Sequence, residues 1–181
     1  MAGKLDVKAA FLDRDGVINR DLGYVYRRED FEFLPNAIAG MKQLVSAGYR
    51  IIVVTNQSGI ARGYYDEETF QCLADWMCEA LAAEGVPVLA VYHCPHHPDG
   101  VVQRLTKVCD CRKPAPGMLL RAKEEHRIDM TGSIMIGDKQ TDVAAGVAAG
   151  VGRVFLIGSL RAYYSGADAV YADLLTCSEQ L

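Results

Sequence analysis

The sequence has no apolar run that approaches the length of a membrane span, which argues against an integral membrane protein. It also lacks a basic stripe or block and carries a net charge of −4, so a nucleic acid is not expected as its main partner. The segment of residues 1–7 is short and polar and does not resemble a signal peptide. We therefore expect a soluble, cytoplasmic protein. No internal repeat, low-complexity tract or linker divides the chain, which predicts a single domain over residues 1–181.

Cysteine occurs six times, but its distribution does not indicate a disulfide framework. Such frameworks are typical of small secreted proteins, and this chain is expected to be neither small nor secreted. Three cysteines are scattered, whereas Cys94, Cys109 and Cys111 lie close together in the sequence, with three of the four histidines nearby. A cluster of cysteine and histidine of this kind indicates a metal site.

The candidate metal ligands form two close groups, Cys94-Pro95-His96-His97 and Cys109-Asp110-Cys111, within an irregular loop of about residues 93–112. Three thiolates and one imidazole suit a closed, tetrahedral, structural Zn²⁺ site, and such a set leaves no open position for catalysis. Spacing alone does not choose among His93, His96 and His97 as the fourth ligand. The alternative is a surface loop with free thiols, but an irregular loop this long needs a constraint.

Two aspartates, Asp13 and Asp15, follow the first apolar run of the sequence. The run from Lys8 to Leu12 predicts a buried strand that stops at a polar site. In an open α/β sheet, chemistry gathers at the carboxyl ends of the strands. Two carboxylates this close repel each other, and a cation or a shared proton must relieve the repulsion. Mg²⁺ is the usual cation for such a pair. The alternative is a turn that merely uses Asp and Gly.

The rest of the sequence alternates between expected strands and expected helices. Apolar or β-branched runs predict strands over residues 8–12, 50–54, 88–92, 133–136, 153–157 and 167–171. Helical spacing and capping residues predict helices over residues 35–48, 66–84, 116–126 and 140–149, with Pro35 at the first position of the first helix. This alternation predicts an α/β protein with a mostly parallel central sheet that helices cover on both faces.

Four motifs stand in order along the chain: Asp13-x-Asp15-Gly16, Thr55, Lys113 and Gly137-Asp138-x-x-x-Asp142. This set resembles, over nearly the whole chain, the motifs of the haloacid dehalogenase (HAD) superfamily of phosphotransferases. The resemblance implies a Rossmann-like three-layer sandwich. Because residues 15–48 and 59–88 are each filled by a loop and one helix, we expect no cap domain. The active site is then open, and the zinc-stapled loop forms part of its wall.

The resemblance implies a chemical role for each residue of the first three motifs. Asp13 attacks phosphorus to form an aspartyl-phosphate, which splits hydrolysis into two easier steps. Asp15 protonates the leaving oxygen and later deprotonates the attacking water. Thr55 and Asn56 offer neutral donors to the phosphate oxygens, while Lys113 supplies positive charge to the transferring group.

The fourth motif implies a Mg²⁺ site, in which Asp138 joins Asp13 and the backbone carbonyl of Asp15. The third motif is usually a single Lys or Arg, so Lys113 is a better match than Lys139. Asp142 has two open interpretations. It either orients a neighbouring group, or it is a helix-terminal carboxylate that faces the positive end of the dipole.

Longer stretches narrow the resemblance within the superfamily. Residues 11–16, 55–63, 94–98 and 109–114 are similar to the branch that holds heptose bisphosphate phosphatases and histidinol-phosphate phosphatases. The resemblance to this branch implies that the zinc ligands are Cys94, His96, Cys109 and Cys111. The implied substrate contacts are Asp21, Leu22, Gly23, Tyr24, Thr55, Asn56, Gln57, Ser58, Arg112, Lys113 and Lys139.

The resemblance favours removal of the C7 phosphate from a heptose bisphosphate, a step toward the ADP-heptose of bacterial surface polysaccharide. Histidinol phosphate is the alternative substrate. A zinc-stapled binding protein without catalysis is the alternative class, and the intact motif set argues against it. The expected cofactors are Mg²⁺ and Zn²⁺, the expected partner is a small phosphorylated sugar, and the expected oligomeric state is a monomer.

Overall fold

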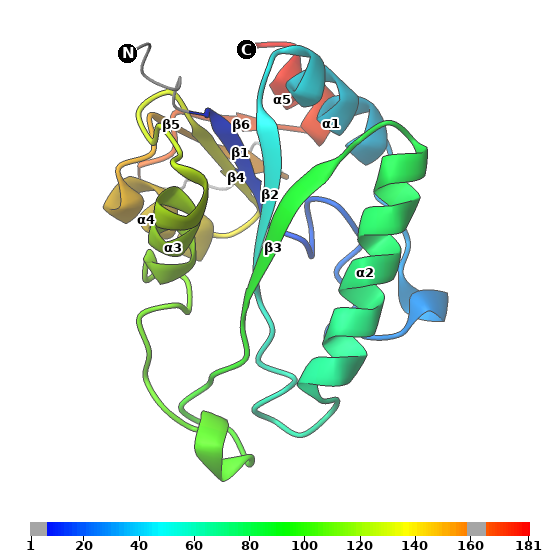
Figure 1. The fold of residues 1–181 in the computed structure, drawn as a ribbon, viewed down its shortest axis with the longest axis vertical. Coiled ribbons are helices and arrows are strands. Elements are labelled where there is room, and N and C mark those ends of the chain that lie inside the picture. Colours follow the sequence, from blue (N-terminus) through cyan, green and yellow to red (C-terminus); the bar gives the residue numbers. More distant parts are fainter. Residues whose placement is uncertain (1–6, 159–165) are drawn as a thin grey trace.

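A parallel sheet of six strands forms the centre of the protein (Figure 1). The structure is a computed structural model that describes residues 7–158 and 166–181. The expectation that residues 1–7 form no signal peptide concerns a segment that lies mostly outside the described residues. The strands are β1 Ala9–Leu12, β2 Arg50–Asn56, β3 Val88–Cys94, β4 Ile134–Gly137, β5 Arg153–Ile157 and β6 Ala169–Tyr171. Their order is β3-β2-β1-β4-β5-β6, and every neighbouring pair is parallel. The predicted parallel α/β architecture is confirmed.

Helices cover both faces of the sheet and complete a three-layer sandwich (Figure 1). They are α1 Ala37–Ser46, α2 Glu67–Ala83, α3 Gly117–His126, α4 Gln140–Ala149 and α5 Leu174–Ser178, with short 3-10 turns η1 Arg28–Asp30 and η2 Gln103–Leu105. The helices α1, α2 and α5 share one apolar cluster with the sheet, and α3 and α4 share the other. Among the described residues, none of the helices combines the length and apolarity needed to cross a membrane.

The period of two along a strand divides the apolar side chains between these clusters. Leu12 and Val53 point into the cluster that contains α1 and α2, whereas Phe11, Ile52 and Val54 point into the cluster that contains α3 and α4. All of them are fully buried. Continuous burial on both faces is typical of a parallel sheet, and it leaves polar groups only at the strand ends.

The strands β2 and β3 run two residues further than their patterns predict. Thr55 pairs with His93 and Asn56 with Cys94, so these polar residues belong to the sheet and form its carboxyl edge. The extension gives the second motif and the first predicted zinc ligand a rigid backbone. Beyond Cys94 the chain leaves the sheet, and Figure 1 shows the loop with η2 extending past the end of β3.

The start of the first helix and the presence of a fifth helix differ from the prediction. Pro35 does not open the first helix; α1 begins at Ala37 after Asn36, whose φ of 65° is left-handed. The short helix α5 was not predicted, because five residues are too few to show helical spacing. The predicted start of α2 is confirmed, since the side chain of Asp66 accepts a hydrogen bond from the backbone N–H of Thr69 at 2.8 Å.

Candidate active site

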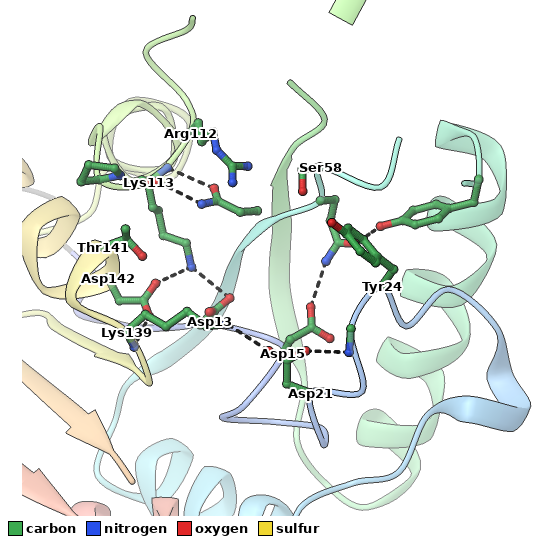
Figure 2. A pocket seen from close by; sticks show the side chains of 15 residues that line it. Asp13, Asp15, Asp21, Tyr24, Ser58, Arg112, Lys113, Lys139, Thr141 and Asp142 are labelled. Carbon is green, nitrogen blue, oxygen red and sulfur yellow. Dashed lines mark hydrogen bonds and ion pairs between the residues drawn. The ribbon is translucent and has the colours of Figure 1, made fainter. Parts of the chain in front are cut away.

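A cavity of about 580 Å³ opens at the carboxyl edge of the sheet, where β1, β2 and β4 end (Figure 2). Parallel strands deliver the residues that follow them to one edge, so motifs that lie far apart in the sequence meet here. The cavity is lined by Asp13, Asp15, Asp21, Gly23, Tyr24, Asn56, Gln57, Ser58, Tyr65, Arg112, Lys113, Pro114, Lys139, Thr141 and Asp142. Most of the predicted site residues are therefore brought together. Among the others, Thr55 and Asp138 lie beside this lining, and Leu22 is exposed.

The side chain of Lys113 is the centre of the charged cluster in this cavity. Its Nζ lies 2.9 Å from Oδ1 of Asp13 and 2.7 Å from Oδ1 of Asp142, and it donates to the carbonyl oxygen of Val54 at 2.7 Å. Figure 2 shows the ammonium between the two carboxylates. Only 1% of the Lys113 side chain is exposed, so these three acceptors replace the water that a lysine normally keeps.

Burial and charge act in opposite directions on this cluster. Burial works against the charge of Lys113, but the adjacent carboxylates of Asp13 and Asp142 outweigh it and raise the pKa of the ammonium. Burial raises the pKa of Asp13 to about 7, because the attraction of Lys113 only partly offsets desolvation and the repulsion from Asp142 and Asp15. A site of this kind favours any further cation that stabilises the carboxylate form of Asp13.

Both interpretations of Asp142 describe the same side chain. Oδ2 accepts from the backbone N–H groups of Asp138 at 3.1 Å and of Lys139 at 2.9 Å, as a carboxylate in the first turn of α4 should. Oδ1 pairs with Lys113. Asp142 therefore ties the start of α4 to the buried lysine and orients its ammonium toward Asp13.

The residues beside Asp13 fit a magnesium ion. Carboxylate oxygens of Asp13, Asp138 and Asp142 lie within 4.8 Å of one another. Oδ1 of Asp138 is buried and has no hydrogen-bond partner among the described residues, and burial raises the pKa of this carboxyl to about 6. An orphaned carboxylate oxygen of this kind is costly unless a cation satisfies it. Gly16 makes room for this side chain, since its φ is +90° and a Cβ there would collide with the Asp138 carboxylate.

Asp15 is held differently from Asp13, although only one residue separates them. Its Oδ1 accepts from Arg14 Nη2 at 2.9 Å and Asn19 Nδ2 at 3.0 Å, and its Oδ2 accepts from Arg14 Nε at 3.2 Å and Gln57 Nε2 at 3.1 Å. Arg14 is 1% exposed and also donates to the carbonyl of Val25. The second aspartate is thus fixed by a buried arginine that the sequence prediction did not single out.

The polar end of β2 fastens the lysine loop to the sheet. Asn56 Nδ2 donates to the carbonyl of Lys113, and Asn56 Oδ1 accepts from the Lys113 backbone N–H, both at 3.0 Å. Thr55 is 1% exposed, and its hydroxyl accepts from Gln57 Nε2 at 2.9 Å. Contacts of Thr55 and Asn56 with a phosphate oxygen remain predictions; the structure assigns their side chains to positioning Lys113 and Gln57.

The loop after β1 closes one side of the cavity through an ion pair. Lys139 Nζ lies 3.0 Å from Oδ2 of Asp21 and 3.7 Å from Oδ2 of Asp138. Partial burial opposes the charge of Asp21, but the Lys139 ammonium and the N–H of Gly23 lower its pKa. Tyr24 lines the cavity with a left-handed φ of 53°, which is unusual for an aromatic residue. Backbone strain of this kind often marks a functional contact.

The four predicted zinc ligands form a compact cluster beside the cavity. The Sγ atoms of Cys94, Cys109 and Cys111 lie 3.1, 3.4 and 3.5 Å from one another, and Nδ1 of His96 lies 3.3 Å from Cys111. A tetrahedron with Zn–S bonds of about 2.3 Å has edges of about 3.8 Å, so the cluster fits this ion. Burial and the neighbouring thiol of Cys111 raise the pKa of Cys94, so its thiolate is unfavourable here without a cation.

Tertiary structure chooses among the three histidines that spacing left open. His96 joins the three thiols. His93 lies against Glu67 at 3.9 Å, and His97 lies 3.3 Å from Nη2 of Arg62. Because Cys111 immediately precedes Arg112, the cluster also fixes where the chain turns back into the cavity. The side chain of Arg112 lines that cavity and reaches the carbonyl of His96 at 3.5 Å.

Known proteins resemble this chain over most of its length. A model of the HAD-hydrolase-like family matches residues 110–158. The D-glycero-beta-D-manno-heptose-1,7-bisphosphate 7-phosphatase of Escherichia coli K12 is 51% identical over 151 residues, which cover 83% of this chain and 79% of that protein. The D-glycero-alpha-D-manno-heptose-1,7-bisphosphate 7-phosphatase of Photorhabdus laumondii is 50% identical over 151 residues, with coverage of 83% and 82%.

This chain belongs to the heptose-1,7-bisphosphate 7-phosphatase family of HAD-like hydrolases. A solved structure supports the assignment: D,D-heptose 1,7-bisphosphate phosphatase from B. bronchiseptica, complexed with magnesium and phosphate, superposes with a TM-score of 0.83 at 33% identity. It covers 96% of this chain and 97% of that one. The homologous enzyme from Burkholderia thailandensis gives a TM-score of 0.67 at 29% identity, with the same coverage. The HAD-like fold is thereby confirmed.

The heptose bisphosphatase site also contains residues that sequence reasoning did not identify. Tyr65 and Thr141 line the cavity, and Arg14 holds Asp15. Thr141 stands one residue before the motif aspartate Asp142, and this position was the available signal. Tyr65 lies in a Gly-containing loop with no motif of its own, so only the fold shows that it reaches the cavity.

Proposed function

We propose that this protein is a Mg²⁺-dependent phosphatase that removes the C7 phosphate of D-glycero-D-manno-heptose 1,7-bisphosphate. The observation that carries the proposal is the buried cluster of Asp13, Lys113 and Asp142 beside the orphaned Asp138 carboxylate, in a chain 51% identical to a heptose bisphosphatase. Such a cluster combines a carboxylate nucleophile with fixed positive charge where a phosphoryl group can be transferred. The product then leads to ADP-heptose and bacterial surface polysaccharide.

The first half-reaction uses the two aspartates in different ways. A carboxylate oxygen of Asp13 attacks phosphorus while the bond to the C7 oxygen breaks, and Asp15 gives its proton to that oxygen. Lys113 lies 2.9 Å from Asp13, where it stabilises charge on the phosphoryl oxygens. In the second half-reaction Asp15 takes a proton from water, which attacks phosphorus and releases phosphate and the Asp13 carboxylate.

The metal ions have separate tasks in this proposal. Asp13, Asp138 and the backbone carbonyl of Asp15 hold Mg²⁺, which when bound neutralises charge on the phosphoryl oxygens. Cys94, His96, Cys109 and Cys111 hold Zn²⁺, which fixes the loop that carries Arg112 and Lys113. We propose that residues 1–181 form one domain, whose zinc loop spans about residues 93–112. We also propose that the protein is a monomer that acts in the cytoplasm and does not bind nucleic acid.

The substrate contacts of the proposal lie on the cavity wall around the aspartates. Arg112 and Lys139 supply positive charge, and the 21–24 loop supplies Asp21, Gly23 and Tyr24. Leu22 is 57% exposed at the outside of this loop, where we propose that it contacts only a bulky substrate. Gln57 and Ser58 complete the wall after β2.

The decisive experiment measures phosphate release from both anomers of heptose 1,7-bisphosphate and from histidinol phosphate, with and without Mg²⁺. We expect Mg²⁺-dependent turnover and higher kcat/KM on the heptose, with phosphorus NMR showing that the C1 phosphate remains. Asp13→Asn should retain the fold and lose turnover, whereas the exposed control Asp75→Asn should be active. Higher kcat/KM on histidinol phosphate would assign the alternative substrate, and no Mg²⁺-dependent release would support the binding protein.

A further inference from the structure

A chain of hydrogen bonds connects Asp15 to a tyrosine that no motif contains. The hydroxyl of Tyr65 donates to Oε1 of Gln57 at 2.5 Å, and Nε2 of Gln57 donates to Oδ2 of Asp15 at 3.1 Å. The same Nε2 donates to the hydroxyl of Thr55 at 2.9 Å. Gln57 is 3% exposed and Tyr65 is 9% exposed, so these groups exchange hydrogen bonds mainly with one another.

The tyrosine controls which end of the Gln57 amide faces the aspartate. Burial raises the pKa of Tyr65 above its ordinary value, so the hydroxyl keeps its proton and needs an acceptor. Gln57 Oε1 is that acceptor. If the amide turned over, the tyrosine proton would lose its partner and Asp15 would face an oxygen, and both changes are unfavourable for buried polar groups.

The Tyr65 ring is itself held in place by its neighbours. It stacks on Tyr26 with ring centroids 4.9 Å apart and an interplanar angle of 13°. Its edge lies over Gly59, where an added Cβ would collide with the ring. The ring belongs to a buried cluster with Ile60 and Phe70. The hydroxyl is thus preorganised, and Gly59 is the residue that allows its close approach.

We propose that Tyr65 is a positioning residue that, through Gln57, aims the carboxyl of Asp15 at the leaving oxygen of the substrate. The proposal rests on the proposed function, in which Asp15 donates the proton that the leaving oxygen takes up as its bond to phosphorus breaks. The bond from Asp13 to phosphorus forms in the same step. Mispositioning Asp15 therefore penalises substrates in proportion to how much their leaving group needs that proton.

The test is the dependence of kcat/KM on the leaving group in Tyr65→Phe. A sugar alkoxide is strongly basic and needs the proton, whereas p-nitrophenolate leaves readily without it. We expect Tyr65→Phe to lose about 10-fold or more in kcat/KM on heptose bisphosphate and on aryl phosphates with basic leaving groups, but under about 2-fold on p-nitrophenyl phosphate. The slope of log kcat/KM against leaving-group basicity becomes steeper than in the wild type.

Two further variants separate this effect from general damage. Tyr26→Phe keeps the ring that stacks on Tyr65 and leaves the hydrogen bond from Tyr65 to Gln57 in place, so its slope should match the wild type. Gly59→Ala displaces the Tyr65 ring and should steepen the slope as Tyr65→Phe does. Equal losses on every ester, or an unchanged slope in Tyr65→Phe, would overturn the proposal. A wild-type protein without phosphatase activity would instead refute the proposed function itself.

Discussion

Nζ of Lys113 lies 2.7 Å from Oδ1 of Asp142, and each of these side chains is only 1% exposed. The pair joins the loop after the zinc cluster to the first turn of α4, and it points the lysine at Asp13. A buried ion pair adds little net stability over an apolar pair, but removing one partner leaves an uncompensated charge. The pair therefore holds the charge of Lys113 in place beside Asp13, and its loss should be costly.

Asp142→Asn should lower the free energy of unfolding by about 3 kcal/mol. This value lies near the lower end of the range for breaking a buried ion pair, because Lys113 still has its ion pair with Asp13. Urea unfolding monitored by circular dichroism gives this number. The matched control is Glu124→Gln on the exposed side of α3, which removes the same charge and should change stability by less than about 0.5 kcal/mol. Equal effects in the two variants would show that Lys113 does not depend on Asp142.

Arg112 and Lys113 are adjacent but should affect different substrates. Lys113→Met removes charge beside the transferring phosphoryl group, so kcat/KM should fall on heptose bisphosphate and on p-nitrophenyl phosphate alike. Arg112→Ala should reduce kcat/KM on the bisphosphate through loss of one charged hydrogen bond, which corresponds to about 1.5–3 kcal/mol of lost transition-state stabilisation. The same variant should barely change kcat/KM on the aryl ester. Arg112→Lys should recover only part of the loss, because its point charge lacks the planar fork. Similar losses on both substrates in Arg112→Ala would place this residue with the catalytic groups.

Protein purified without added metal should contain one zinc ion per chain by elemental analysis. Cys109→Ala should lose that zinc, since it removes one of the four clustered ligands. Its kcat/KM should also fall, because the loop no longer fixes Arg112 and Lys113. Cys72→Ala is the control, as Cys72 is exposed and remote from the cluster in sequence, and it should retain both zinc and activity. Zinc-free wild-type protein with full activity would contradict the role of the cluster.

Asp173 should stabilise α5 in a pH-dependent way. Its Oδ1 accepts from the backbone N–H of Thr176 at 2.8 Å and its Oδ2 from Asn36 at 2.7 Å, and these donors lower its pKa. Asp173→Ala should cost about 1 kcal/mol at neutral pH. Because the folded pKa lies below the ordinary 3.8, the ionised carboxylate stabilises fully above that pH, and its contribution is lost as the pH falls through the folded pKa. Asp173→Asn keeps the capping oxygen and should show no loss of this contribution at low pH. Thermal unfolding of the wild type and both variants from pH 7 to pH 2.5 measures the difference.

The order of elements and the catalytic motifs could be predicted from the sequence because both are local patterns. Apolar runs such as residues 50–54 specify buried strands, and alternation with helical spacing specifies a parallel sheet. Parallel strands place their carboxyl ends at one edge, so the sequence predicts that Asp13, Lys113 and Asp138 meet there. The grouping of Cys94 with Cys109 and Cys111 was equally local, since ligand type and spacing carry it.

Tertiary structure alone decided the partners of these residues. Spacing left three histidines open, and only the family resemblance implied His96. The structure places His96, rather than His93 or His97, with the three thiols, because side-chain direction at the end of β3 is invisible to spacing. It also brought Tyr65 to Gln57, and Asp142 to Lys113, across loops whose paths no periodicity specifies. Sequence patterns report which groups are present and which strand end carries them. The distances between these groups come from long-range packing, which only the folded chain defines.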